Sequence, residues 1–135
     1  MEWVMLVPSI VFSRLKNTFS ADLKTKYNMT DDNFSTVAES YDEAVFPFVY
    51  FRTLPATEVG RDLEGKEING AIFTFEIQIT DNRFQKNTRE IMSECLRIMK
   101  DMRFEAVSMP EINSTRETHI AIARFRRVVG KGDGI

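Results

Sequence analysis

Few side chains in this 135-residue sequence have the types and spacing that bond chemistry requires. Histidine and cysteine occur once each, as His119 and Cys95. A lone imidazole lacks the partners that activate a nucleophile, and one histidine cannot make a two-histidine zinc site. His119 lies in a segment that alternates like a strand, and Cys95 lies on the apolar side of a predicted helix. We interpret both as structural or surface residues.

Two short polar motifs also lack the spacing of an ion-binding site. Asp31 and Asp32 could hold a cation, but the ligand spacing of an EF-hand does not follow them, so a solvated turn is the better interpretation. The run Gly130–Lys131–Gly132 lacks the Gly-x4-Gly-Lys-Ser/Thr pattern of a phosphate-binding loop. We therefore predict no catalytic residue, no cofactor and no metal, and we expect that the protein is not an enzyme.

The composition is that of an ordinary globular domain, with 43% hydrophobic residues, 28% charged residues and a net charge of -2. Domains held on nucleic acid by bulk charge are usually strongly basic, so this class is excluded. No stretch approaches the roughly 20 apolar residues that span a bilayer, and we predict no membrane contact. We expect one domain over residues 1–129 and a flexible C-terminal tail over residues 130–135.

The segment from Gly70 to Thr80 has the clearest pattern in the sequence. One face would carry Ala71, Phe73, Phe75, Ile77 and Ile79, and the other Ile72, Thr74, Glu76, Gln78 and Thr80. This period of two predicts a strand with one buried and one mostly wet face. An amphipathic segment follows almost at once, so we expect a helix that folds back over this strand.

Two helices are predicted. The first runs from Pro8, which suits a first helical turn, to about Tyr27. Its apolar stripe holds Val11, Phe12, Leu15, Phe19 and Leu23. The second begins after Asn82, which makes a partial capping box with Gln85. Its apolar side holds Phe84, Ile91, Met92, Cys95, Ile98, Met99 and Met102.

Three further strands are predicted at residues 46–52, 104–109 and 118–129, where aromatic and β-branched residues are frequent. Residues 28–42 are polar and predict a loop with room for one short turn. Residues 111–115 predict a turn-rich link.

The predicted order is therefore α-β-β-α-β-β, with a long loop between the first two strands. This order indicates an α+β fold with a mainly antiparallel sheet of about four strands and both helices on one face. The other face would keep polar residues, namely Thr74, Glu76, Gln78, Arg124 and Arg126.

Residues 54–69 are unusual because they carry a proline, two glycines and many charges between two natural hairpin partners. A connection this long in a compact domain is commonly functional or mobile. We predict an arm that docks on a neighbouring subunit or a tube through Leu54, Glu58, Arg61, Asp62, Glu64, Lys66 and Glu67. The alternative is a disordered hairpin loop without a partner.

A second candidate surface is basic. Arg124 and Arg126 share one face of the last strand, and Arg127 follows them. We predict that this strand faces a partner or a lumen, where arginines would meet acidic groups or nucleic acid. The alternative is a solvated edge strand whose charges prevent strand-to-strand aggregation.

Taken in order, three segments resemble the small tail-terminator, or tail-completion, proteins of long-tailed bacteriophages. The first is Phe46-Pro-Phe-Val-Tyr-Phe, after a helix and a polar loop. The second is Asn69-Gly-Ala-Ile-Phe-Thr-Phe-Glu-Ile-Gln-Ile-Thr-Asp-Asn, which leads into the helix with Arg89-Glu-Ile-Met. The third is Met102-Arg-Phe-Glu-Ala, then a proline and the closing strand. Where the family often has a glycine ahead of the aromatic residue, this sequence has Met-Arg-Phe.

The resemblance implies a structural virion protein that forms a ring, typically a hexamer, at the head-proximal end of the tail tube. Such a ring stops tube polymerisation and gives the head–tail connector a docking face. The implied partners are further copies of the chain, the tail tube protein and the connector, with DNA passing through the lumen. The implied location is the virion tail, after assembly in the host cytoplasm. Two alternatives stay open: a head-completion or neck connector protein, and a module that binds a small ligand or a peptide.

Overall fold

A computed structural model of the chain describes residues 2–37, 45–60, 69–108, 110–115 and 118–135. The described helices are α1 (Glu2–Thr18), α2 (Ala21–Lys26) and α3 (Gln85–Asp101), with a short 3-10 helix, η1, at Asp31–Asn33. The described strands are β1 (Phe34–Ser35), β2 (Phe48–Thr53), β3 (Thr57–Val59), β4 (Gly70–Asp81), β5 (Glu105–Ala106), β6 (Glu111–Ser114) and β7 (His119–Gly130).

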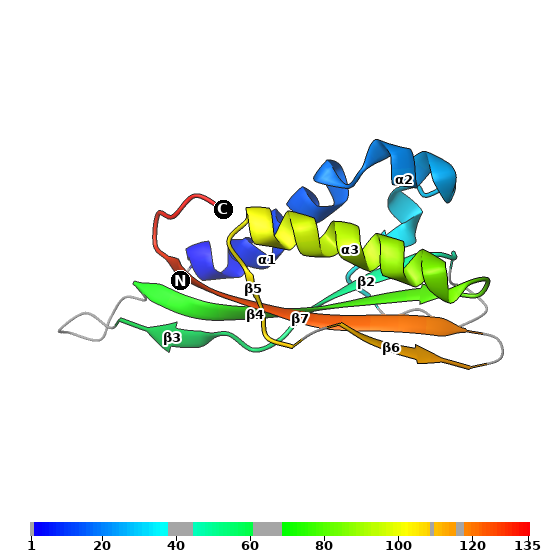
Figure 1. Cartoon of the computed structure of the whole chain (residues 1–135). Coiled ribbons are helices and arrows are strands. Elements are labelled where there is room, and N and C mark those ends of the chain that lie inside the picture. Colours follow the sequence, from blue (N-terminus) through cyan, green and yellow to red (C-terminus); the bar gives the residue numbers. More distant parts are fainter. Residues whose placement is uncertain (1, 38–44, 61–68, 109, 116–117) are drawn as a thin grey trace.

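The elements form two layers. Figure 1 shows α1, α2 and α3 on one side of a twisted sheet, and the same view shows no described helix on the other side. The described strands are ordered β1-β2-β4-β7-β5, with β3 also beside β4 and β6 also beside β7. Only the β1–β2 pair is parallel among these pairs. The predicted α+β class, the mainly antiparallel sheet and the helices on one face are confirmed, whereas the predicted number of strands was too small.

The strand predicted to be central is β4. It pairs with β7 over twelve residues and with β2 and β3 on its other side. Its helix-facing residues are fully buried, as predicted, and they pack with alternate residues of β7 and β2. Stacked rings of Phe51, Phe75 and Phe73 form the middle of this core. The helix α3 folds back over β4 and β7, also as predicted.

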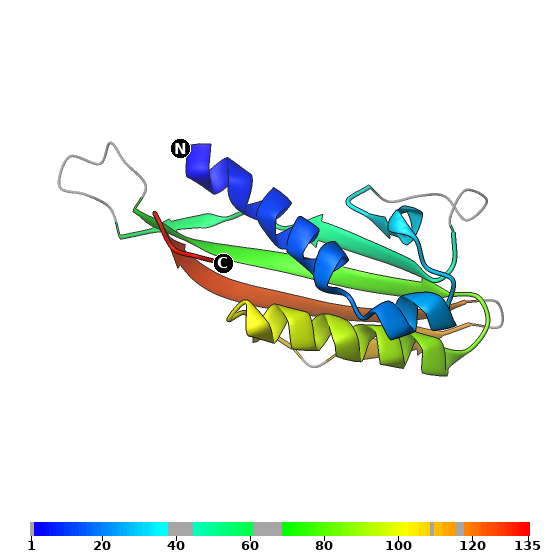
Figure 2. The same cartoon turned by 90° about the horizontal axis from the view of Figure 1, so that it is seen from above.

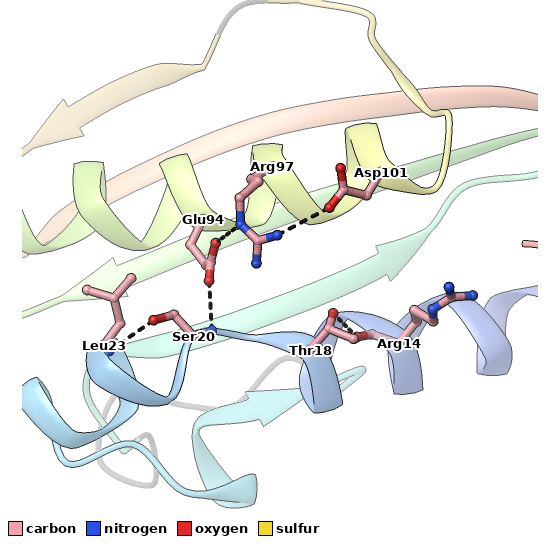
Figure 3. A network of polar contacts seen from close by, with 7 residues as sticks. All are labelled: Arg14, Thr18, Ser20, Leu23, Glu94, Arg97 and Asp101. Carbon is pink, nitrogen blue, oxygen red and sulfur yellow. Dashed lines mark hydrogen bonds and ion pairs between the residues drawn. The ribbon is translucent and has the colours of Figure 1, made fainter.

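The predicted first helix is two helices. It begins at Glu2 rather than at Pro8, and the chain leaves the helix after Thr18 and re-enters one at Ala21. The apolar stripe stays in phase across this break, so periodicity did not reveal it. A contact from α3 lies at the break: the Ser20 N–H donates to the Glu94 carboxylate at 2.7 Å, as Figure 3 shows. The Ser20 hydroxyl in turn caps α2 by accepting from the N–H of Leu23.

The second predicted helix is confirmed as α3, but its start is built differently. The residue before the helix is Phe84, whose side chain is 66% exposed and makes no cap. Asp81 fixes the turn before the helix without capping it: its buried carboxylate accepts from the N–H groups of Arg83 and Phe84 and from the side-chain amide of Asn87. The predicted capping box and the predicted inward position of Phe84 were therefore wrong.

Two other segments differ from expectation. The predicted turn-rich link at 111–115 contains β6, which makes a hairpin with β7. The polar loop at 28–42 contains the expected short turn, η1, and also β1.

The C-terminal residues contact the helix side of the sheet. The last residue of β7 is Gly130, and Ile135 packs against the core. The backbone oxygens of Gly134 and Ile135 accept from Arg127 and Arg14 respectively. The mobility predicted for residues 130–135 stays a prediction.

Candidate interaction surfaces

The segment predicted to be an arm is partly a strand. β3 lies inside it and pairs with β4 at residues 70–72, directly beyond the stretch of β4 that pairs with β2. β2, a three-residue break and β3 therefore follow one side of β4, so the predicted long loop is shorter than expected. Figures 1 and 2 show β3 and the adjoining end of β4 extending beyond α1.

The structure describes two of the residues proposed for the arm, and the others lie outside the described residues. Leu54 is half-buried, and its N–H donates to the backbone oxygen of Thr74 at 2.9 Å. Glu58 is exposed on β3 and lies opposite Ala71 in the ladder. The remaining residues of the prediction, Arg61, Asp62, Glu64, Lys66 and Glu67, lie outside the described residues, and their role stays a prediction.

The helix-free face of the sheet carries a row of charges across three strands. Arg52, Glu76 and Arg124 are direct neighbours in the ladders of β2, β4 and β7. The Arg124 Nε donates to Glu76 Oε2 at 2.8 Å, and the Arg52 guanidinium lies 3.9 Å from Glu76 Oε1. Gln78 also donates to Glu76 Oε1. The Glu76 carboxylate is thereby enclosed, and only 3% of the residue is exposed.

The pKa of Glu76 follows from this enclosure. Burial alone would raise the pKa, because a carboxylate loses hydration when it is covered. The hydrogen bonds from Gln78 and Arg124 and the two guanidinium charges outweigh burial and lower the pKa. The row is therefore a charged feature of this face at neutral pH. The sequence predicted Glu76 and Arg124 on this face, but it did not predict Arg52 there or the contacts among the three side chains.

The structure does not bring the three predicted arginines to one face. Arg124 and Arg126 lie on the helix-free face, as predicted, but Arg127 has the parity of the buried residues of β7. Its guanidinium donates to the backbone oxygen of Met102 at 2.9 Å, just after α3, and to that of Gly134 at 3.2 Å. The alternative of a solvated edge was wrong, because β7 lies between β4 and the pair β5 and β6.

A basic hollow lies at the β5 side of β7. It has a volume of about 500 Å³ and is lined by Ile72, Arg103, Glu105, Arg126, Arg127 and Val128. Sequence reasoning missed Arg103, which sits in the turn after α3 with a positive φ of 65°. No local spacing relates Arg103 to the arginines of β7, so only the fold could reveal this cluster.

A further surface that the sequence did not predict is the outer side of α1. Met5, Leu6 and Ile10 are 74%, 58% and 46% exposed. Beside them, Pro8 and Thr53 line two adjoining hollows of about 380 and 360 Å³ between α1 and the β2–β3 segment. The apolar residues at the start of α1 are thus distributed around the helix, and only some of them enter the core.

The residues weighed for chemistry lie apart from one another. Cys95 is buried on the core-facing side of α3, as predicted, and burial raises the pKa of its thiol. The ring of His119 at the start of β7 is within 2.8 Å of the Ser114 hydroxyl.

In the described part of the chain, no three or more histidine, cysteine or acidic residues gather where a metal could bind. None of the described helices is long and apolar enough to cross a bilayer.

Comparison with known proteins adds no family to this description. A scan against protein-family models finds no match for the chain. A search of curated proteins finds no significantly similar sequence. The surfaces above therefore have to be interpreted from their own geometry.

Proposed function

We propose that this protein is a structural assembly protein of a phage tail, and that it forms the terminator ring at the head-proximal end of the tail tube. In this role it binds further copies of itself, typically as a hexamer, together with the tail tube protein and the head–tail connector. DNA passes through the lumen of the ring. The protein acts in the virion, after assembly in the host cytoplasm, by fitting surfaces together and not by transforming a substrate.

The observation that carries the proposal is that two large surfaces stay exposed to solvent among the described residues: one face of the sheet and the outer side of α1. One face of the sheet has no described helix and holds the row Arg52–Glu76–Arg124. The outer side of α1 exposes three large apolar side chains. Exposed apolar patches next to charged surface are typical of protein–protein contact sites. A subunit of a ring needs at least two such surfaces, because each copy contacts a neighbour on both sides.

The resemblance in the strand–helix–strand segments supports the terminator in particular. The hairpin formed by β3 and β4 extends from the body, as an arm toward a tube or a neighbouring subunit requires. The helix-free face offers Arg124 and Arg126 to a partner or to the lumen. Arg127 has a different role in this proposal, since it holds the chain after α3 and the C-terminal residues.

The decisive experiment is assembly of tail tubes in the presence of the protein. Tube protein from the phage that encodes this chain is polymerised with and without it, and tube lengths are measured by negative-stain electron microscopy. A terminator shortens the tubes and appears as a ring at one end only. Rings that leave tube length unchanged but bind to capsid portals would assign the protein to the neck. A chain that forms no ring and binds no tube would contradict both assignments.

A further inference from the structure

We propose that the two outer edges of the sheet are the two halves of one contact between subunits. The free edge of β2 and β3 in one copy pairs with the β5–β6 edge of the next copy. The inference rests on the proposed function, because a closed ring is built from a contact between two different surfaces of identical subunits. It specifies which surfaces meet and which chemistry joins them.

The first edge has unpaired backbone groups. β1 pairs only with residues 49–50 of β2, and no described strand lies beside the rest of this edge. The N–H of Leu54 points to β4, where it donates to Thr74. Ladder bonds alternate along an antiparallel strand, so Thr53 directs its N–H and C=O groups outward, beyond the part of β2 that pairs with β1. An edge of this kind is a template for one more strand.

The second edge, formed by β5 and β6, also directs backbone N–H and C=O groups away from the sheet. The N–H of Thr115 donates to the backbone oxygen of Thr118 at 2.7 Å, which fixes the phase of the β6–β7 ladder. By the same alternation, Ile112 and Ser114 of β6 direct their N–H and C=O groups away from β7. No described strand lies beyond β5 and β6. The two edges therefore offer donors and acceptors that each copy leaves unused.

The strand directions also fit. β2 is antiparallel to β4, β4 to β7, and β7 to β6, so β2 and β6 run in opposite directions. A second copy placed beside the first, without being turned over, brings its β2 antiparallel to the β5–β6 edge. The antiparallel order of the sheet then continues from one subunit into the next.

Charge complementarity identifies a second copy as the occupant. On the helix-free face, the first edge carries Arg52. Its guanidinium lies 3.9 Å from the Glu76 carboxylate, which is a loose contact, and its side chain is about half exposed. On the same face, the second edge carries Glu105 and Glu111, which are both exposed. Opposite charges on neighbouring strands attract, and like charges in these places would oppose pairing. Glu105 and Glu111 lie opposite Arg126 and Ile122, on either side of the row Arg52–Glu76–Arg124, so the contact would join the basic end of this row to an acidic edge.

The helix side of the first edge has room for the incoming strand. The two hollows beneath α1, of about 380 and 360 Å³, follow β2 and the break after it, and Thr53 lines both. Side chains of a paired strand that point toward the helix layer would enter these hollows. Met5 and Phe12 of α1 would then be covered by the neighbouring subunit.

Light scattering after size-exclusion chromatography tests the proposal on the full chain, over a range of protein and salt concentrations. Two substitutions in β2 are designed to disrupt pairing at the first edge. Thr53→Pro removes an outward N–H and leaves the ladder to β4 intact, which edge strands tolerate. Arg52→Glu places a like charge against Glu105 and Glu111. Each is expected to weaken the contact between subunits by about tenfold or more. Circular dichroism verifies folding, and Arg89→Glu on the exposed side of α3 is the charge-matched control.

Restoration of the contact gives the sharpest outcome. Arg52→Glu combined with Glu111→Arg should recover association, because the charges are exchanged between the two edges and Glu111 lies opposite the uncharged Ile122. If wild-type rings form and folded Arg52→Glu and Thr53→Pro still assemble normally, the edge contact is wrong and the proposed function stands. If the exchanged variant does not recover, the β5–β6 edge is not the partner and the inference is overturned. A wild-type chain that stays monomeric, with or without tube protein, overturns the inference and the proposed function together.

Discussion

The two long helices lie on the same face of the sheet and have 17 residues each, but their outer sides differ. α3 keeps its apolar residues against β4 and β7, and it presents Arg89, Arg97 and Lys100 to solvent. α1 buries Val7 and Val11, and its first half also exposes large apolar side chains on its outer side.

The difference between the helices concerns how much of each apolar surface the fold itself covers. A helix that is apolar on one side only is complete within its own domain, whereas one that is apolar all round is usually buried on both sides. α3 therefore belongs entirely to the fold of this chain. The first half of α1 has one side that packs in the core and one apolar side that the described residues leave exposed, which is the side that we propose for a contact.

The largest effect should come from truncating α3 inside the core. Ile91→Ala removes a fully buried side chain and should lower the free energy of unfolding by about 2–5 kcal/mol. The matched change on α1, Ile10→Ala, removes a half-exposed side chain and should lower it by less than about 1 kcal/mol. Chemical denaturation measures both. Equal losses would mean that the outer side of α1 is as important to folding as the core.

Removal of the contact between Glu94 of α3 and Ser20, which precedes α2, should lower the unfolding free energy by less. Glu94→Gln removes the charge that accepts from Ser20 and Arg97, and about 1.5–3 kcal/mol of unfolding free energy should be lost. Asp101→Asn is a suitable control, because Asp101 is exposed and pairs with a different nitrogen of Arg97 from the one that donates to Glu94, as Figure 3 shows for the contacts. That control should be close to neutral. A similar loss in both variants would contradict the role given to Glu94.

The contribution of Glu94 to stability should decrease as the pH falls. The hydrogen bond from Arg97 lowers the pKa of Glu94, and the Ser20 N–H adds to this effect against the opposing influence of burial. A carboxyl whose pKa is lowered by folding stabilises the protein above its unfolded pKa, and this stabilisation disappears as the pH falls through the folded pKa. Unfolding free energies measured from neutral pH to below the ordinary value of 4.5 should therefore fall less steeply for Glu94→Gln than for the wild type. Identical slopes would show that Glu94 does not titrate differently in the folded state.

The start of α3 offers a gain in stability. Phe84 occupies the N-cap position without a capping side chain, and its ring is mostly exposed. Phe84→Ser supplies an acceptor for the first free N–H groups of the helix and should raise the unfolding free energy by about 0.5–1 kcal/mol. Phe84→Ala tests whether removal of the ring alone explains the gain. A loss with serine would indicate that the ring makes a stabilising contact.

The smallest effect on folding is expected on the outer side of α1. Leu6→Gln should change the unfolding free energy by less than about 0.5 kcal/mol, because the side chain is exposed. Association measured by light scattering should nevertheless weaken, if the exposed apolar side of α1 is a contact. Asn17→Gln, at an exposed position in the second half of the same helix and away from both hollows, is the control. An unchanged ring in Leu6→Gln would end the distinction drawn between the two helices.

The strongest local patterns were sufficient to predict the centre of the fold. The alternation in β4 and β7 and the apolar side of α3 predicted two strands, one helix and most of the core. β1, β3 and β6 were missed because each is short and places at most one or two residues against the core, so pairing with a neighbour defines them. The break after Thr18 was missed for a related reason: its main partner, Glu94, lies 74 residues away from Ser20.

The candidate surfaces were predictable only in part. The parity of β7 already separated Arg127 from Arg124 and Arg126, since Arg127 alternates with the buried Phe125 and Val129. The basic hollow could not be predicted, because Arg103 joins it through the turn after α3. The exposed apolar side of α1 was hidden by the assumption that Pro8 begins the helix.

The position of the last residues has a practical consequence for labelling. Ile135 lies beside α1, on the same side of the sheet as the helices. A fluorescent protein or an affinity sequence joined there would start on the helix side. It would leave the opposite face of the sheet accessible, so that binding measured with such a fusion reports on that face without obstruction. A fusion at this position would, however, crowd α1, and a label intended to follow contacts of α1 should be attached to a residue on the opposite face.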